Sequence, residues 1–148
     1  MANTPSPASR NPPTHWVLLA GQAEPLAVAR ERVRDLLADV VSCVDDAVLV
    51  TSELVGNAVR HTAAGPDRLT IEIDAHHVVV SVHDSEDDRG GVRPPALSDR
   101  DPLAESGRGL RLVEMLTRRW YVEATATGKA VVAVLPRREV LVSRGAGS

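Results

Sequence analysis

Two consecutive segments near the middle of the chain alternate apolar and polar residues, and they restrict the fold more than any other feature. The segments are residues 68–74 and 76–84, and their apolar positions are Leu69, Ile71, Ile73, Val78, Val80 and Val82. Alternation with a period of two places these side chains on one face of each strand. The short link at Ala75 predicts that the strands pair as a hairpin. A hairpin is not stable alone in water, so other elements must cover its apolar face.

The segments on either side of the hairpin predict helices and further strands that can provide this cover. The predicted elements are, in chain order, a strand over 15–20, helices over 25–40 and 42–61, the two hairpin strands, a helix over 107–118, and strands over 121–125 and 129–135. Strands joined mostly as hairpins predict a mixed, mostly antiparallel sheet. We therefore expect an α+β two-layer sandwich with the helices on one face of the sheet.

Composition predicts a single domain between two polar ends. Residues 1–14 are rich in Pro, Ser, Asn and Thr and predict a disordered arm. Residues 15–136 predict the folded domain, and residues 137–148 predict a polar tail. Within the domain, residues 85–106 combine proline and glycine with many charges. A long irregular segment inside a compact domain is typical of a lid over a functional site.

The basic residues exclude two kinds of site. Lys129 is the one lysine beside sixteen arginines, and it is followed by Ala130. A P-loop requires Ser or Thr directly after its lysine, so any nucleotide must bind without a Walker motif. The net charge is −3 and no basic stripe is present, which argues against nucleic acid as a direct ligand.

The remaining composition predicts a cytoplasmic protein. A single cysteine, Cys43, excludes an internal disulfide and a cysteine-based zinc site. The N-terminal residues lack the apolar core of a signal peptide. The apolar runs are shorter than the roughly 20 residues that span a bilayer. We therefore expect no membrane association.

The second predicted helix carries a carboxylate and an amide one turn apart. Glu53 and Asn57 are four residues apart, so they stack on one side of the helix, away from its apolar face. The carboxylate can take a proton from a hydroxyl, and the amide oxygen is a ligand for a hard cation such as Mg²⁺. On spacing alone, an incidental pair on a solvated helix face is the simpler explanation.

Two further features lie at the ends of predicted elements. Asp84 continues the buried alternation of its strand, where a carboxylate is costly unless it is hydrogen-bonded, for instance by an exocyclic amine. Residues 106–110 (Ser-Gly-Arg-Gly-Leu) open the third predicted helix. Glycines let the backbone approach a ligand closely, and a helix N-terminus favours phosphate. The simpler explanations are a frayed strand end and an ordinary loop-to-helix joint.

Taken in order, these residues resemble one nucleotide-binding superfamily, that of gyrase, the heat-shock chaperones, histidine kinases and MutL, which has the Bergerat fold. The string from Glu53 to His61 matches its first motif, Asp84 falls at the start of its first glycine box, and residues 107–113 fall on the second. The strings SELVGNAVRH and GRGLRLVEMLTRRW are similar to those of bacterial anti-sigma factor serine/threonine kinases, above all the small stand-alone actinobacterial ones. The resemblance covers residues 15–136.

The resemblance implies a protein kinase that uses ATP and Mg²⁺. Glu53 would activate the attacking hydroxyl of a protein substrate, and Asn57 would bind Mg²⁺. Asp84 would accept a hydrogen bond from the adenine amino group. The other implied nucleotide-binding positions are His61, Ser106, Gly107, Arg108, Gly109 and Leu110.

The resemblance also implies partners and a regulatory role. A kinase of this type would phosphorylate a small antagonist protein on Ser or Thr and would sequester a sigma factor. Homodimers are common among such kinases, so a homodimer is a further expectation. Direct contact with nucleic acid is not expected.

Two positions depart from the family pattern and leave a second function open. Glu86 stands where the first glycine box has Gly or Ser, and it adds negative charge near an anionic ligand. Ala130 stands where relatives often have Thr or Ser, so a hydroxyl that helps to hold the base would be lost. The alternative is a non-catalytic partner-binding module with weak or no nucleotide binding. A detached histidine kinase domain is less favoured, because no dimerisation helix with a phospho-acceptor histidine is present.

Overall fold

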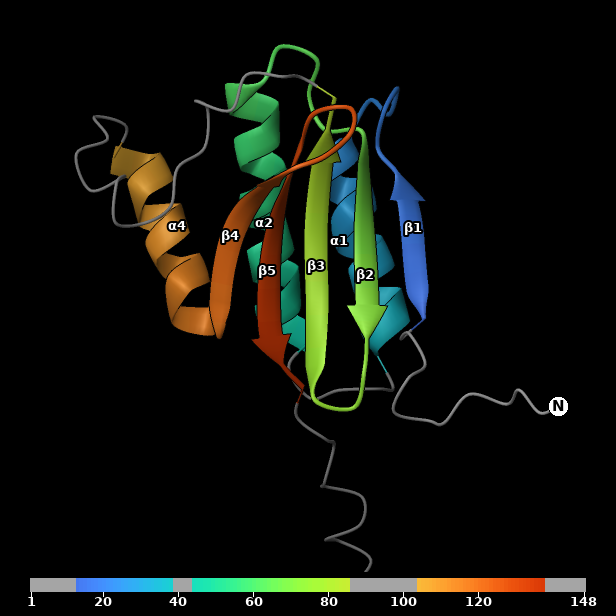
Figure 1. Ribbon diagram of the computed structural model, residues 1–148, viewed down its shortest axis with the longest axis vertical. Helices are drawn as coiled ribbons and strands as arrows, with labels where there is room; N and C mark the ends of the chain where they lie inside the picture. The colour runs from blue at the N-terminus through green and yellow to red at the C-terminus, as the bar shows by residue number, and fades with distance from the viewer. Residues whose placement is uncertain (1–12, 39–43, 86–103, 138–148) are drawn as a thin grey trace, which may run out of the picture.

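The fold has two layers, one of strands and one of helices (Figure 1). The computed structural model describes residues 13–38, 44–85 and 104–137, with side chains from residue 109 onward in the last segment. The elements are β1 (Thr14–Leu18), α1 (Pro25–Leu37), α2 (Val44–His61), β2 (Arg68–Ile73), β3 (His77–Asp84), α4 (Ala104–Leu116), β4 (Arg119–Ala124) and β5 (Lys129–Pro136). The strands form one sheet in the order β1-β2-β3-β5-β4. Every pairing among these described strands is antiparallel, and the predicted α+β two-layer sandwich is confirmed.

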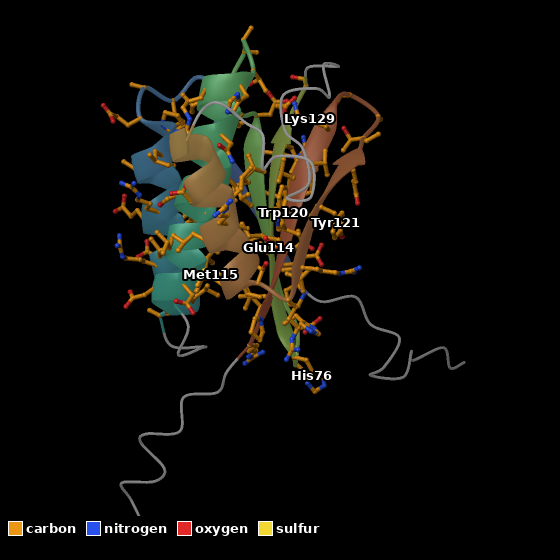
Figure 2. All side chains as sticks on the ribbon, turned by 90° about the vertical axis from the view of Figure 1, so that its left-hand side faces the viewer. His76, Glu114, Met115, Trp120, Tyr121 and Lys129 are labelled. Atoms are coloured by element: carbon orange, nitrogen blue, oxygen red, sulfur yellow. The ribbon has the colours of Figure 1, made fainter. Side chains whose placement is uncertain are left out.

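The core lies between the helices and one face of the sheet (Figure 2). The inward residues of β2 and β3 are those predicted from the alternation, and the fully buried ones are Leu69, Ile71, Val78, Val80 and Val82. The apolar face of α1 adds Ala29, Val33 and Leu37, and that of α2 adds Ala47, Val48, Val50, Leu54, Val55 and Ala58. Trp120 is the one aromatic side chain in this cluster of described residues. Aliphatic packing therefore holds α2 in place above β3 and β5.

A carboxylate closes the turn between β2 and β3. Asp74 Oδ1 accepts hydrogen bonds from the backbone N–H groups of His76 at 2.8 Å and His77 at 2.6 Å. Partial burial acts to raise the pKa of Asp74, but these N–H groups and the nearby histidine charges outweigh it, so the pKa lies below its usual value. Asp74 therefore carries its negative charge at neutral pH.

The ends of several elements differ from the prediction by one to three residues, and for two of them the cause is clear. α4 begins at Ala104, three residues before the predicted start at Gly107. Alanine and glutamate at its start favour helix, and a glycine weakens a helix without ending it. β1 ends at Leu18, because the next two N–H groups both donate to the Asp67 carbonyl, at 2.8 and 2.9 Å, instead of continuing the ladder.

The two tryptophans lie in different environments, because Trp120 packs in the core and Trp16 does not. Trp16 is 61% exposed. Its neighbour Val17 faces the core, so the strand period turns Trp16 to the opposite face. There the guanidinium of Arg68 lies 4.8 Å from the centre of its ring.

Three predicted segments lie largely outside the part of the chain that the structure describes. Most of the N-terminal arm, of the 85–106 lid and of the C-terminal tail lies outside the described residues. Thr14, predicted as part of the arm, instead begins β1, and the Arg137 N–H donates to the His76 carbonyl at 2.8 Å. None of the described helices is both long enough and apolar enough to cross a bilayer.

Candidate functional site

Three polar side chains follow one another along α2. Glu53, Asn57 and Arg60 are four and three residues apart, which places each one turn beyond the last. Asn57 is only 2% exposed, and its Oδ1 accepts a hydrogen bond from Arg60 Nη2 at 2.9 Å. Asn57 is therefore not part of a solvated helix face, which was the simpler explanation for its spacing from Glu53. Arg60 was not predicted as a site residue, although its three-residue spacing from Asn57 indicated that the two side chains meet. His61, which was predicted as a site residue, is the last residue of the helix.

Asn57 suits one ligand position of a magnesium ion, and the described residues do not complete a metal site. No group of three His, Cys, Asp or Glu side chains among them could hold a metal. Asn57 Nδ2 is buried with no hydrogen-bond partner in the described part of the chain, while Oδ1 is used by Arg60. Mg²⁺ at nucleotide sites keeps waters and takes oxygens from the phosphates. Asn57 Oδ1 therefore fits the role of one ligand of a Mg²⁺ ion that arrives with a nucleotide. To take this role, it would give up the hydrogen bond that it accepts from Arg60.

The carboxylate of Glu53 lies against the backbone of α4. A Cβ atom at Gly109 would overlap Glu53 Oε1 and would lie 2.8 Å from Glu53 Cδ. Gly109 is buried, so the missing side chain is what lets the carboxylate reach this position between α2 and α4. The structure thus brings together two predicted site residues that are far apart in the sequence.

The predicted phosphate turn, residues 106–110, lies inside α4 and not in front of it. The first four N–H groups of a helix have no partner within the helix, and here they belong to residues 104–107. Leu110 was predicted to line the phosphates; its side chain is 5% exposed and packs in the core, so its backbone is the part to which this prediction still applies. The side chains of Ser106 and Arg108 lie outside the described residues.

A buried ion pair stands at the end of β3. Asp84 and Lys129 are register partners on β3 and β5, and Lys129 Nζ lies 3.0 Å from Asp84 Oδ2. Their side chains are 3% and 0% exposed, and Asp84 follows Val82 on the helix-covered face. The burial predicted for Asp84 is therefore confirmed. Lys129 is the first residue of β5, which confirms the predicted start of that strand (Figure 2).

These features lie at one end of the domain. The C-terminal half of α2, the end of β3, the start of β5 and the first turns of α4 all lie in the upper part of Figure 1. Packing of α2 against α4, β3 and β5 holds them in this arrangement. The carboxylate, amide and guanidinium of α2 therefore stand at the same end as the Asp84–Lys129 pair.

Gly128 lets the β4–β5 turn approach the end of β3. A Cβ atom there would overlap the Asp84 carbonyl oxygen and lie 2.8 Å from Ser85 Cα, and these backbone atoms cannot swing aside. We expect Gly128→Ala to lower the free energy of unfolding by about 1–3 kcal/mol, measured in urea. Gly56→Ala is the control, because its Cβ meets only the flexible Arg60 side chain, at 3.3 Å. Alanine is favoured inside a helix, so an equal loss in both variants would contradict this account.

Ala130 lies on the other face of the sheet from the ion pair. Lys129 and Val131 face the helices, so Ala130 faces outward, where its register partners are His83 and Glu123. A hydroxyl at position 130 would not point toward the helix-covered face. The effect of the missing hydroxyl on nucleotide affinity therefore stays a prediction, and a direct contact through the helix-covered face is not its basis. Glu86 lies outside the described residues.

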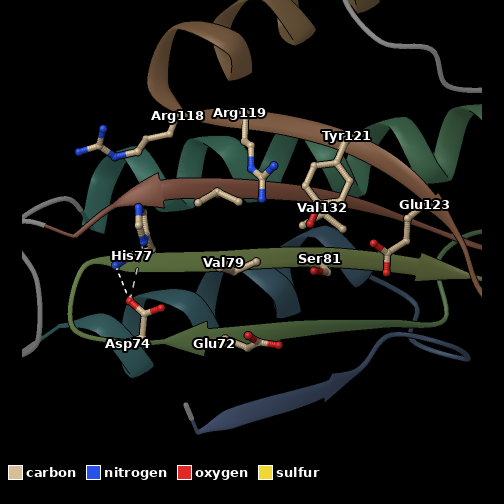
Figure 3. Close-up of a pocket in the computed structure, with 11 residues that line it drawn as sticks. Glu72, Asp74, His77, Val79, Ser81, Arg118, Arg119, Tyr121, Glu123 and Val132 are labelled. Atoms are coloured by element: carbon tan, nitrogen blue, oxygen red, sulfur yellow. Dashed lines mark hydrogen bonds and ion pairs between the residues drawn. The ribbon is translucent and has the colours of Figure 1, made fainter. Parts of the chain in front are cut away.

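A separate hollow lies on the outer face of the sheet, away from the helices (Figure 3). The residues lining it are Glu72, Asp74, His77, Val79, Ser81, Arg118, Arg119, Tyr121, Glu123, Val132 and Val134. It contains none of the residues predicted to bind nucleotide. The hollow has acidic side chains on the β2 side, while Arg119 stands over the ring of Tyr121 at 5.1 Å on the β4 side.

Comparison with known proteins adds one finding to this geometry. The family model described as "Histidine kinase-like ATPase domain" matches residues 19–135. This range contains α1 through β5 almost entirely, including every element of the candidate site. No curated protein matches the chain.

Proposed function

Because the chain belongs to the histidine kinase-like ATPase domain family, we propose that it binds ATP together with Mg²⁺ at the end of the domain where α2, β3, β5 and α4 meet. The observation that carries the proposal is the row of Glu53, Asn57 and Arg60 on α2, with the Glu53 carboxylate against Gly109. A carboxylate, a metal-ligating amide and a guanidinium in one row are the groups that phosphoryl transfer requires.

The proposed reaction is transfer of the γ-phosphoryl group of ATP to a serine or threonine hydroxyl of another protein. Glu53 accepts the proton of that hydroxyl as its oxygen forms the new bond to phosphorus, and ADP leaves. Asn57 would ligate Mg²⁺, which would neutralise charge on the phosphates. Arg60, released from Asn57, pairs with a phosphate oxygen. Asp84 accepts from the adenine amino group.

The proposed partners follow from the likeness of the motifs to anti-sigma factor kinases. The protein substrate is a small antagonist protein, and the same domain sequesters a sigma factor in the cytoplasm. The proposal includes no direct contact with nucleic acid, in keeping with the net charge of −3.

A non-catalytic partner-binding module remains the second candidate. Its support is Glu86, whose charge would oppose an anionic ligand if it faced the site. The other departure, Ala130, lends it no support, because this residue lies on the outer face of the sheet.

Titration calorimetry separates the two candidates. The kinase proposal expects 1:1 binding of ATP in the presence of Mg²⁺, with a dissociation constant below 1 mM, as is ordinary for nucleotide-using enzymes. It also expects Asn57→Ala to remove most of the dependence of this affinity on Mg²⁺. Binding of a partner without any heat of ATP binding would instead support the module.

We propose that the outer face of the sheet forms the homodimer. Strand register places Arg119 and Glu72 in one row across this face, and Glu123 and Arg68 in another. If two copies meet face to face about an axis along the strands, Arg119 of each copy faces Glu72 of the other. The same rotation brings Glu123 opposite Arg68. The larger apolar residues of this face are Trp16, Leu18, Val79, Tyr121, Val132 and Val134.

Charge reversal tests this dimer. We expect Arg119→Glu to weaken self-association by about tenfold or more in sedimentation equilibrium, because it sets like charges against each other. The double variant Arg119→Glu with Glu72→Arg restores the pairing and should recover most of the affinity. A monomeric wild-type protein, or a dimer that Arg119→Glu leaves unchanged, would contradict the proposed interface.

A further inference from the structure

The side chain of Arg60 folds back along α2 onto Asn57. Its Nη2 donates a hydrogen bond to Asn57 Oδ1 at 2.9 Å. The buried Gly56 leaves room for the guanidinium, because a Cβ atom at position 56 would lie 3.3 Å from Arg60 Nη1 and 3.9 Å from Arg60 Cζ. The turn of helix before Arg60 therefore supplies both an acceptor and a place for its charged group.

This hydrogen bond uses the Asn57 atom that could ligate a hard cation. The amide oxygen is the only acceptor on an asparagine side chain, and Asn57 is only 2% exposed. A guanidinium stays charged at neutral pH. A divalent ion that shared the oxygen would stand next to a like charge, and repulsion between neighbouring charges is strong at the partly buried surface of a protein. Arg60 and a metal ion therefore exclude each other at Asn57.

The polar groups that Asn57 and Arg60 leave available are donors. Asn57 Nδ2 is buried without a hydrogen-bond partner in the described part of the chain. Arg60 is exposed, and a guanidinium has five N–H donors, of which Nη2 supplies one to Asn57. A buried donor without an acceptor is costly. In this arrangement the two residues suit an anion such as a phosphate group, and they do not suit a cation.

We propose that Arg60 blocks the metal-ligating oxygen of Asn57, so that the site takes up a divalent ion only together with a phosphate group that draws the guanidinium away. The proposal rests on the nucleotide site proposed above and adds the order in which this site assembles. With respect to the metal, Arg60 acts through Asn57 and is a positioning residue.

The exchange of partners by Arg60 is physically favourable. Because Arg60 is exposed, its side chain can leave Asn57 without disturbing the core. A guanidinium binds phosphate more strongly than a neutral amide, since phosphate carries the opposite charge and can accept from two N–H groups at once. A metal ion alone offers the guanidinium no such partner. A phosphate group can therefore displace Arg60 from Asn57, whereas a free metal ion has to overcome it.

A manganese titration tests the block without nucleotide. Mn²⁺ takes the same kind of oxygen ligands as Mg²⁺, and it broadens the NMR signals of groups close to it. The signal to follow is the side-chain amide of Asn57 in ¹⁵N-labelled protein. We expect Arg60→Met to need at least about tenfold less Mn²⁺ than the wild type for the same broadening, because the like charge is gone and the oxygen is open.

Arg32→Met is the matched control for this titration. It removes the same charge from an exposed position on α1, so it should behave as the wild type. The block is overturned if the wild type and Arg60→Met broaden at the same Mn²⁺ concentration. It is also overturned if Arg32→Met increases the sensitivity to Mn²⁺ as much as Arg60→Met, because net charge would then explain the effect.

Titration of metal-free ATP in the presence of EDTA tests the other half of the exchange. Arg60 is the cation that the phosphates meet before a metal ion is present, so we expect Arg60→Met to weaken this binding by at least about tenfold in calorimetry. Metal-free binding that is absent from the wild type, or equal in the two proteins, would overturn the proposal, because the phosphates would then not draw Arg60 away.

The two measurements also separate this proposal from the function on which it rests. A wild-type protein that binds no ATP even with Mg²⁺ would overturn the proposed function and, with it, the order of assembly. Equal broadening by Mn²⁺ in the wild type and Arg60→Met, beside normal binding of ATP with Mg²⁺, would overturn the role of Arg60 alone.

Discussion

Lys129→Met is expected to lower the free energy of unfolding by about 3–5 kcal/mol, because it removes one partner of an ion pair whose side chains are almost fully buried. The lysine is fully buried, and its Nζ stands 3.0 Å from Asp84 Oδ2. Methionine fills much of the same volume, so packing loss is a minor part of the effect. Urea unfolding followed by circular dichroism measures the change. A small domain has only about 5–15 kcal/mol of stability, so this effect is large.

The double variant with Asp84→Asn is the matched control for this prediction. Replacing both partners of a buried ion pair by neutral groups is often harmless to stability. We therefore expect the double variant to be more stable than Lys129→Met alone. If Lys129→Met unfolds at the wild-type urea concentration, the ion pair does not contribute to the fold as its burial indicates.

Glu53→Gln is expected to reduce phosphoryl transfer to the antagonist protein by about 10²–10⁴-fold, which is the usual contribution of a positioned general base. Glutamine has nearly the same shape but does not take up the proton of the attacking hydroxyl. ATP affinity should change little, because the carboxylate acts on the substrate hydroxyl and does not hold the nucleotide. Transfer of label from ATP, with affinity measured in parallel, separates the two effects.

Two further variants test whether the loss of phosphoryl transfer arises from the Glu53 carboxylate. Glu31→Gln removes an exposed carboxylate on α1 and should leave transfer unchanged. Gly109→Ala puts a methyl group where the Glu53 carboxylate now lies, so it should also lower transfer by displacing that group. Full transfer by Glu53→Gln would remove this residue from the proposed reaction.

Local patterns were sufficient for the parts of the site that lie within one element. The 3.6-residue period of α2 places Glu53 and Asn57 on one side of a helix whose other side is apolar, and the structure has this helix. The alternation along β3 predicted that Asp84 faces the core, and it is 3% exposed. In both cases the information lies in neighbouring residues, so no knowledge of the rest of the fold was needed.

The contacts of the site that were not predicted from the sequence depend on how distant elements pack against each other. Whether Lys129 reaches Asp84 is decided by the register of β3 against β5, which the sequence of neither strand specifies. The contact of Glu53 with Gly109 likewise depends on the packing of α2 against α4.

The central claim is that nucleotide binds between α2, α4 and the end of β3, and an NMR titration tests its location most directly. Adding ATP and Mg²⁺ to ¹⁵N-labelled protein should shift the backbone signals of Asn57, Arg60, Asp84 and Gly109, and the side-chain amide of Asn57. Signals from the outer-face hollow, such as that of Tyr121, should stay in place. Shifts confined to that hollow, or none at millimolar ATP, would contradict the account.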